Sequence, residues 1–377
     1  MKNFDFDLTE LCSRGVRGLK PYEPGKPIAE LQRELGIRDV IKLASNENPL
    51  GPSPKALAAI RNALAGLAAY PDGQAYELRQ AIAEKHRIDP RCITFGDGSD
   101  QNLEFLARAF LEPGCNAVMS RHAFAVYAIV TQAVGAEIRF AAAHPATHPH
   151  MPYGHNPDAM LAAIDKHTRM VCIANPNNPT GTWLDRASLL HFLEQVPQRV
   201  LVVVDEAYIE YVSEPQYPDC SQWLGDFPNL VVTRTFSKAY GLAGLRAGYS
   251  LSHRAVAELL NRIRQPFNVN NLAQAGALAA LSDTQHLEKT LAVNQAGMRQ
   301  FEQGLRTLNL SWIPSIGNFL TVDFQRPARA IYEALLREGV IVRPLHNYAM
   351  PNHLRVTIGL PDQNIRLLQA LKKVLAA

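Results

Sequence analysis

The sequence lacks several features that would assign it to other classes of protein. Its 377 residues include five cysteines, an odd number spread along the chain without a C-x-x-C pair. This favours reduced thiols in the cytoplasm over a disulfide framework or a zinc site. No apolar run approaches the roughly 20 residues that a membrane span needs. The first ten residues are polar and acidic, unlike a signal peptide.

An excess of charge of one sign is also missing. The formal net charge is +3 and the charges are interspersed, so we expect neither a nucleic-acid partner nor a membrane surface. The chain is 47% hydrophobic and 19% charged, which is typical of a globular protein with one large domain and one smaller domain.

Nucleotide-binding loops are present only in part. Residues 96–101 form a Gly-rich turn between a predicted strand and a predicted helix, where free N–H groups can bind phosphate. Gln101 stands where the dinucleotide fingerprint needs its third Gly, and no GxxxxGK[ST] motif occurs. The sequence therefore gives little support to a dinucleotide site or to a P-loop.

A group of histidines at 144, 148, 150 and 155 lies between prolines. The spacing of His144 and His148 would suit a metal on a helix, but Pro145 and Pro149 disfavour a helix there. We expect a solvated loop.

The pattern of apolar runs predicts an α/β fold. Uninterrupted β-branched runs at 170–174, 200–204 and 230–233 indicate strands buried on both faces, and they alternate with helical segments. We therefore expect a large domain with a mostly parallel sheet covered by helices. After about residue 270, helices at 271–281 and 286–308 precede strands at 317–323, 340–344 and 354–358, which indicates a smaller α+β domain. The predicted organisation is an irregular arm over 1–30, a large domain over 46–270, and a small domain formed by 31–45 and 271–377.

Lys238 is the first candidate catalytic residue. It follows the predicted strand 230–233, where partial desolvation would lower its pKa and make the neutral amine accessible. Such an amine suits a Schiff base with pyridoxal phosphate, and Ser237 and Arg246 could bind the phosphate. A surface lysine beside a helix cap is the alternative for an isolated Ser-Lys pair.

Polar residues at neighbouring strand ends supply what a pyridoxal ring needs. Asp205 follows a five-residue apolar strand and is costly there without a partner, which a protonated ring nitrogen would provide. Tyr208 and Asn178 could hydrogen-bond the ring oxygen. Taken singly, Asp205 could be a helix N-cap, and the other two could be turn or packing residues. Ligands in such sheets bind at the carboxyl ends of the strands, where all of these residues lie.

Taken together, these motifs resemble the fold-type I pyridoxal-phosphate-dependent aminotransferases over nearly the whole chain. Within that family the likeness is greatest to the group that acts on histidinol phosphate. The stretches that carry the resemblance are 43–52, 96–100, 177–181, 205–208, 235–238 with 242–246, and 354–359.

The resemblance implies a role for each matching residue. Lys238 would form the Schiff base and move the proton, Asp205 would pair with the ring nitrogen, and Tyr208 and Asn178 would bind the ring oxygen. The remaining implied cofactor contacts are Ser99, Asp100, Gln101, Phe124, Ser237 and Arg246, with Tyr70 reaching the cofactor phosphate of the neighbouring subunit in a homodimer. Phe124 would stack on the ring where many relatives carry Tyr, and core packing is its alternative.

The resemblance also implies a substrate site made of Tyr22, Asn46, Arg343 and Arg355. Arg355 matches the position that binds a substrate α-carboxylate. Histidinol phosphate has none, so the arginine pair would bind its phosphate, and it would bind the carboxylate of glutamate in the other half of a ping-pong reaction. As alternatives, Arg343 could be a surface arginine, and Tyr22 and Tyr70 could be packing aromatics.

Three other functions remain open from the sequence: an aromatic amino-acid aminotransferase, a decarboxylase of a phosphorylated amino acid, and a non-catalytic regulator that binds pyridoxal phosphate. Regulators of this kind usually carry a DNA-binding module. The roughly 20–40 irregular residues before the core leave no room for a helix-turn-helix with its supporting helices.

Overall fold

The computed structural model describes residues 7–376, and its largest element is a seven-stranded sheet in the order β2-β8-β7-β6-β5-β3-β4. Only β8 runs antiparallel to its neighbours, so the predicted mostly parallel sheet is confirmed. The strands are β2 (Ile93–Gly96), β3 (Asn116–Ser120), β4 (Glu137–Ala141), β5 (Thr168–Ala174), β6 (Leu201–Asp205), β7 (Leu230–Thr235) and β8 (Gly248–Ser252).

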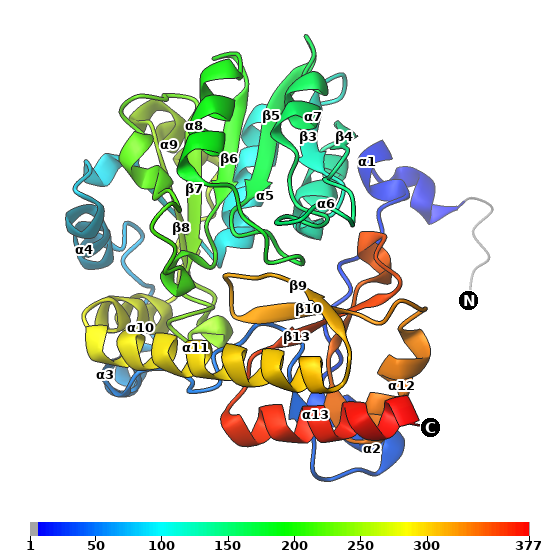
Figure 1. Cartoon of the computed structure of the whole chain (residues 1–377). Helices are drawn as coiled ribbons and strands as arrows, with labels where there is room; N and C mark the ends of the chain where they lie inside the picture. Colours follow the sequence, from blue (N-terminus) through cyan, green and yellow to red (C-terminus); the bar gives the residue numbers. More distant parts are fainter. Residues whose placement is uncertain (1–6, 377) are drawn as a thin grey trace.

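Helices cover both faces of this sheet (Figure 1). Alternate residues of β6 explain why: Val202 and Val204 belong to one apolar core, and Leu201 and Val203 belong to another on the opposite face. A strand buried on both faces needs this continuous apolar run. The covering helices are α4 (Tyr76–His86), α5 (Ser99–Phe110), α6 (Ala125–Ala133), α7 (Pro157–Ala162), α8 (Arg186–Gln195) and α9 (Arg254–Ile263).

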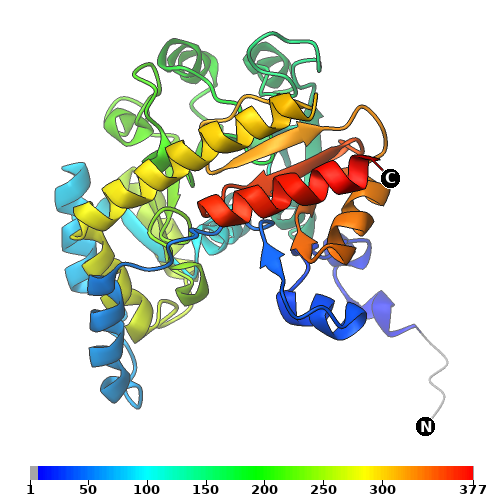
Figure 2. The ribbon, with the colours of Figure 1, turned by 60° about the horizontal axis from the view of Figure 1, so that its bottom comes forward.

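A second layer contains a four-stranded antiparallel sheet in the order β12-β13-β10-β9. Figure 2 shows α11 and α13 crossing one side of it, and Phe301, Leu305, Leu367 and Leu371 from these helices join Leu320 of β10 in one core. The elements are α11 (Thr284–Thr307), β9 (Ser311–Ile313), β10 (Phe319–Asp323), α12 (Arg329–Arg337), β12 (Arg343–Pro344), β13 (His353–Thr357) and α13 (Pro361–Ala376).

The N-terminal half also contributes to this layer. β1 (Ile41–Lys42) pairs in parallel with β11 (Val340–Ile341), next to α2 (Ile28–Leu35). By contrast, α10 (Asn271–Leu281) packs against α3 (Pro54–Ala63), and its Ala273 and Ala277 belong to the core of the seven-stranded sheet. The domain boundaries at residues 30, 45 and 270 stay predictions.

Several local expectations need correction. The predicted strand over 340–344 is divided between two sheets, because Val340–Ile341 pairs with β1 and Arg343–Pro344 pairs with β13. The helix expected after the Gly-rich turn over 96–101 begins within that turn, at Ser99, and Gly98 with its positive φ of 78° is its N-cap. The sequence reading also missed α8, α9, β8 and β9.

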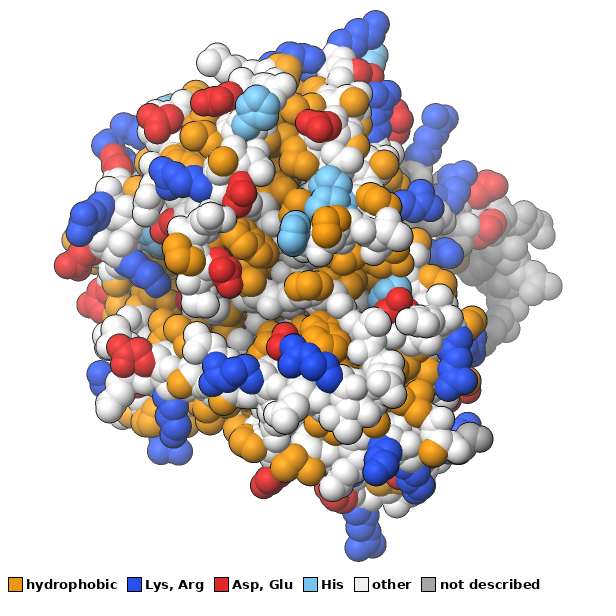
Figure 3. Space-filling view, viewed as in Figure 1, with side chains coloured by type: hydrophobic (Ala, Val, Ile, Leu, Met, Phe, Trp, Pro, Cys, Tyr) orange, Lys and Arg blue, Asp and Glu red, His pale blue; other side chains and the backbone are white. Residues whose placement is uncertain are grey.

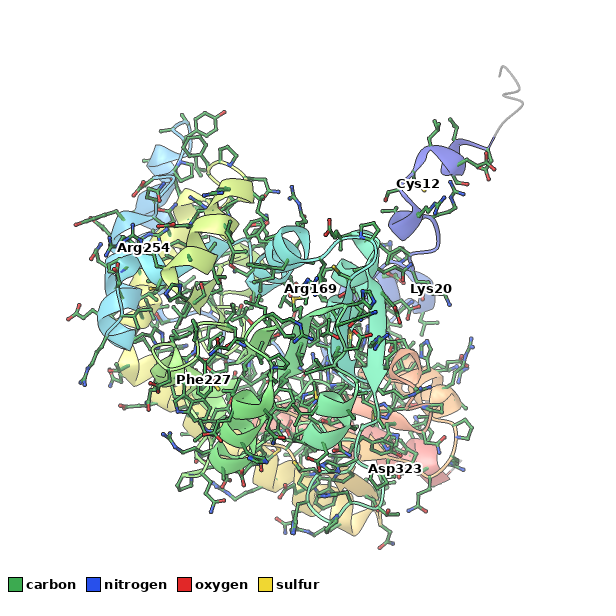
Figure 4. All side chains as sticks on the ribbon, turned by 90° about the horizontal axis from the view of Figure 1, so that it is seen from above. Cys12, Lys20, Arg169, Phe227, Arg254 and Asp323 are labelled. Carbon is green, nitrogen blue, oxygen red and sulfur yellow. The ribbon has the colours of Figure 1, made fainter. Side chains whose placement is uncertain are left out.

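The arm contains short helical turns in place of the expected irregular chain. They are Leu8–Leu11 and α1 (Arg14–Arg17), and residues 1–6 of the predicted arm lie outside the described range. Figure 4 shows this segment, with Cys12, projecting from the body, and Lys20 where the chain returns to it.

Among residues 7–376, no helix combines the length and apolar character needed to cross a membrane. On the face that Figure 3 shows, basic and acidic side chains are interspersed, as the sequence analysis expected.

A buried ion pair connects the ends of β6 and β7, the two strands that lead to Asp205 and Lys238. The guanidinium of Arg234 donates to Glu206 Oε2 at 2.7 and 3.0 Å, and Nη2 also donates to Asp219 Oδ1 at 2.5 Å. Arg234 is 4% exposed and Glu206 is fully buried. Because side chains alternate along a strand, this pair lies on the face opposite Asp205 and Thr233.

We predict that Glu206→Gln lowers the free energy of unfolding by about 3 kcal/mol, because it leaves a buried guanidinium with too little negative charge. The matched control is Glu258→Gln, which breaks an exposed pair with Arg254 on α9 and should cost no more than about 1 kcal/mol. Urea unfolding followed by circular dichroism measures both, and equal losses would contradict the prediction.

Candidate active site

A cavity of about 390 Å³ lies at the carboxyl ends of β5, β6 and β7, against the four-stranded sheet. Both layers line it, as expected for an α/β sheet whose strand ends bind ligands. Most of the residues singled out from the sequence line it: Tyr22, Asn46, Ser99, Asp100, Phe124, Asn178, Asp205, Tyr208, Ser237, Lys238, Arg246, Arg343 and Arg355. The roles assigned to them stay predictions.

Lys238 follows the end of β7 and points into the cavity. Its Nζ donates to the backbone oxygen of Ser45 at 3.1 Å and lies 5.9 Å from the centre of the Tyr208 ring. Burial, together with the positive charge of Arg355, lowers the pKa of Lys238 to about 8. About a tenth of the amine is therefore neutral and nucleophilic at pH 7, far more than for a lysine with its usual pKa.

Asp205 is the last residue of β6 and is 5% exposed. Its Oδ2 accepts a hydrogen bond from the Tyr127 hydroxyl at 2.9 Å, and its Oδ1 accepts one from the Thr233 hydroxyl at 2.9 Å. Burial raises the pKa of Asp205 to about 6, although both hydrogen bonds act to lower it. Among the described residues, no Lys or Arg lies within ion-pair distance of this carboxylate.

Tyr208 and Asn178 are each held by a residue from the other layer. The Tyr208 hydroxyl accepts a hydrogen bond from Asn46 Nδ2 at 2.8 Å, and Asn178 Oδ1 accepts one from the Arg355 guanidinium. Asn46 adopts a positive φ of 55° and its backbone N–H donates to Thr357 Oγ1 at 2.9 Å, which fixes the turn that presents its amide. Burial raises the pKa of Tyr208, so its hydroxyl keeps its proton at neutral pH.

The part of the cavity wall formed by the start of α5, Ser237 and Arg246 has the features of a phosphate site. Ser99 and Asp100 form the first turn of α5, where backbone N–H groups have no partner within the helix. Arg246 Nη1 lies 3.4 Å from Ser237 Oγ. Glycine is favoured at Gly98 because its φ of 78° and ψ of 168° form a backbone conformation that residues with a Cβ rarely adopt. The carboxylates of Asp97 and Asp100 lie 3.9 and 3.6 Å from Arg246 and are half exposed, so they neutralise it only weakly.

Two buried arginines face each other across neighbouring strands. Arg343 on β12 pairs in register with Arg355 on β13, and each is 4% exposed. Arg355 donates to the backbone oxygen of Ala44 at 2.7 Å, whereas Arg343 Nη2 and Arg355 Nε have no hydrogen-bond partner among the described residues. Like charges directly opposite each other are destabilising, and unpaired donors add to the cost. The pair is therefore suited to bind an anion with more than one oxygen.

Aromatic rings complete the cavity wall. Tyr22 in the arm lies under the Arg343 guanidinium at 5.6 Å and contacts Phe124 edge-on, with ring centroids 6.3 Å apart. Phe124 caps the N-terminus of α6 and is partly exposed to the cavity, where a flat ring could lie against it.

Two predicted cofactor contacts do not line this cavity. The Gln101 side chain instead binds the loop after α9, accepting from Asn268 Nδ2 at 2.7 Å and donating to Gln265 Oε1 at 3.1 Å. Tyr70 is 82% exposed and stacks on Phe267 of the same loop, with ring centroids 4.7 Å apart.

The sequence reading missed Tyr127 and Thr233, which bind Asp205 directly. Both lie within apolar segments that read as core, and nothing in their local pattern signals a polar contact. The histidines at 144, 148, 150 and 155 lie outside helices and strands, but the expected solvated loop is wrong for His155, which is 2% exposed and whose Nε2 lies 2.8 Å from the backbone oxygen of Ala174. Within residues 7–376 no group of three or more His, Cys, Asp or Glu is arranged to hold a metal ion.

The residues present fit pyridoxal phosphate. A buried carboxylate without a cationic partner suits a ring N–H, a lysine with a lowered pKa suits the aldehyde, and a helix N-terminus beside Ser237 and Arg246 suits the phosphate. These three features line one cavity, and the cofactor's ring nitrogen, aldehyde and phosphate need all three together.

Comparison with known proteins agrees with this arrangement. The family model for class I and II aminotransferases matches residues 38–371. A histidinol-phosphate aminotransferase of Pseudomonas aeruginosa is 58% identical over 98% of this chain and 99% of its own length. One from Methylococcus capsulatus is 54% identical, over 98% and 99%. Among solved structures, histidinol-phosphate aminotransferase from Sinorhizobium meliloti in complex with pyridoxal-5'-phosphate superposes with a TM-score of 0.88, at 27% identity, covering 100% of this chain and 99% of the other.

The raised pKa of Asp205 predicts a stability cost in the cofactor-free protein. Between about pH 4 and 6 the folded state holds this proton more tightly than the unfolded state, so the free energy of unfolding falls as pH rises through that window. A shift of about two pKa units corresponds to about 3 kcal/mol.

We therefore expect Asp205→Asn to gain stability relative to the wild-type apoprotein by up to about 3 kcal/mol on going from pH 4 to pH 8. Denaturant unfolding of both proteins at the two pH values measures this double difference. A constant difference between the two proteins at both pH values would contradict the prediction.

Proposed function

This chain belongs to the class I and II aminotransferase family, and we propose that it catalyses transamination between histidinol phosphate and 2-oxoglutarate, giving imidazole-acetol phosphate and glutamate, a reaction of histidine biosynthesis. The observation that carries the proposal is the buried Arg343–Arg355 pair beside Lys238 and Asp205 in one cavity. The names of the most similar relatives support the choice of histidinol phosphate.

Pyridoxal phosphate, when bound, supplies an aldehyde that combines with amines and a ring that accepts the electron pair left on the substrate carbon. Ser99, Asp100, Ser237 and Arg246 would hold its phosphate, and Phe124 would lie against the ring.

Lys238 Nζ would take the proton from the substrate carbon and return it during the transfer. Its pKa of about 8 places it close to the operating pH, where a general base and acid works best. The Tyr208 ring 5.9 Å away and the Ser45 oxygen limit where the amine can lie.

Asp205 would hold a proton on the ring nitrogen through its carboxylate. Asn46 and Arg355 orient Tyr208 and Asn178, whose polar atoms would bind the ring oxygen. These two ring contacts from the large sheet are therefore each supported by a residue that also bonds to the small-sheet side of the cavity.

The arginine pair explains how one site accepts two different substrates in turn. Two guanidinium groups offer enough donors for a dianionic phosphate, and the same donors can bind a carboxylate of glutamate. A ping-pong reaction needs this shared site, because the amino donor leaves before the acceptor binds.

We propose that the protein acts as a homodimer in the cytoplasm. Tyr70 would reach the partner's cofactor phosphate. It is exposed and stacks on Phe267, which is also exposed, and a subunit interface would cover both rings. All five cysteines are free, as in a reducing compartment.

Steady-state kinetics test the function. With 2-oxoglutarate as acceptor, we expect kcat/KM for histidinol phosphate to exceed that for phenylalanine and tyrosine by at least about 100-fold, since only the first supplies a dianion to both arginines. Lys238→Ala should lack both activity and the absorbance near about 400–430 nm that a lysine Schiff base gives. Preference for the aromatic amino acids would overturn the substrate assignment.

We predict that Arg343→Met raises KM for histidinol phosphate by about 10- to 100-fold, because it removes charge-assisted hydrogen bonds to the phosphate. The thioether side chain fills similar apolar space, so the strand pairing should persist. Arg329→Met on α12, where the arginine is 89% exposed, is the control and should leave KM unchanged. An unchanged KM in Arg343→Met would exclude Arg343 from the phosphate site.

A further inference from the structure

Tyr127 is a buried polar residue that none of the steps above uses. It lies in the first turn of α6, is fully buried, and does not line the cavity. Its hydroxyl nevertheless donates to Asp205 Oδ2 at 2.9 Å. Its ring contacts Phe124 edge-on, with centroids 5.7 Å apart at 89°.

Asp205 and Phe124 are the two groups that would contact the cofactor ring at its nitrogen and on its face. One side chain therefore touches both from outside the cavity. The second carboxylate oxygen of Asp205 accepts from Thr233, so both oxygens are tethered and the carboxylate plane is fixed. Each oxygen can accept more than one hydrogen bond, which leaves capacity for a ring N–H.

The hydroxyl of Tyr127 is also a donor that does not switch off. Complete burial and the neighbouring negative charge of Asp205 raise the pKa of Tyr127 well above 10. A donor that cannot ionise stabilises the charged form of the carboxylate at every working pH, and so opposes the effect of burial.

Building on the proposed function, we propose that Tyr127 is a positioning residue for the cofactor ring. Its hydroxyl orients Asp205 and keeps it an anion for the ring nitrogen, and its ring supports the face of Phe124.

Asp205 is the group in this part of the site whose charge changes near pH 6, because its titratable neighbours with shifted pKa values titrate well above that pH. Burial raises the pKa of Cys172 on β5 and of Tyr208, so both stay neutral. Lys238 titrates near 8. Asp100 in α5 raises the pKa of Asp205 by charge repulsion.

The test replaces Tyr127 by Phe, which keeps the ring and its packing and removes only the hydroxyl. The affinity of the apoprotein for pyridoxal phosphate is measured by absorbance from about pH 5 to 8. The affinity should fall at low pH as Asp205 becomes protonated, and we call this fall the acid limb. Loss of one hydrogen bond to the charged carboxylate should move the midpoint of the acid limb upward by about one pH unit. In the reconstituted holoenzyme, kcat should fall by about 10-fold with little change in the KM for histidinol phosphate.

The matched control is Tyr249→Phe. Tyr249 is 3% exposed on β8 of the same sheet, and its hydroxyl pairs with His86 Nε2 at 3.0 Å, away from the cavity. It should keep the wild-type acid limb and kcat. Melting temperatures of both variants establish that they are folded.

A second measurement separates positioning from packing. In an Asp205→Asn background, Tyr127→Phe should cause no further loss of cofactor affinity, because the anion that it supports is gone. An equal loss in both backgrounds, or a Tyr127→Phe acid limb and kcat that match the wild type, would overturn the inference. Failure of the wild-type protein to bind pyridoxal phosphate or to transaminate would instead overturn the proposed function.

Discussion

The carboxylate of Asp205 is buried at the end of β6 without a cation beside it, and the rest of the site is arranged around that cost. Hydrogen bonds from Tyr127 and Thr233 stabilise its charge only in part, since burial still raises its pKa to about 6. A protonated ring nitrogen would supply the missing positive charge. The protein therefore carries a destabilising charge that the cofactor relieves, which is a common relation between stability and function at active sites.

The four-stranded sheet buries positive charge without a counter-ion among the described residues, as the seven-stranded sheet buries the negative charge of Asp205. Arg343 and Arg355 stand in register on neighbouring strands with unpaired donors, so the small sheet holds two buried positive charges that an anion would stabilise. Lys238 lines the same cavity, and its amine is made less basic by burial and by Arg355. Asp205, Lys238 and the two arginines thus give one cavity a buried negative charge, an amine of lowered pKa and a buried positive charge.

The two layers depend on each other through short polar contacts. Asn46 connects Tyr208 with Thr357 of β13, and Arg355 connects Asn178 with Ala44. On the opposite face of the large sheet, the Arg234–Glu206 pair fixes the strand ends that present Asp205 and Lys238. Movement of either layer would therefore displace the contacts to the ring, which makes the site sensitive to changes outside the cavity.

The sequence by itself determined the mostly parallel sheet, because continuous apolar runs at 170–174, 200–204 and 230–233 are stable only when both strand faces are buried. It also placed Lys238, Asp205 and Asn178 at strand ends, since a polar residue that directly follows such a run must lie at the sheet edge. Local pattern failed for β8 and α9, which lack a distinctive run, and for Tyr127 and Thr233, whose partner is 78 or 28 residues away in the chain. It also could not show that Gln101 and Tyr70 lie outside this cavity, or that Arg343 is buried opposite Arg355. Only the tertiary structure decided these contacts, because burial and hydrogen bonding between distant segments depend on how the layers pack.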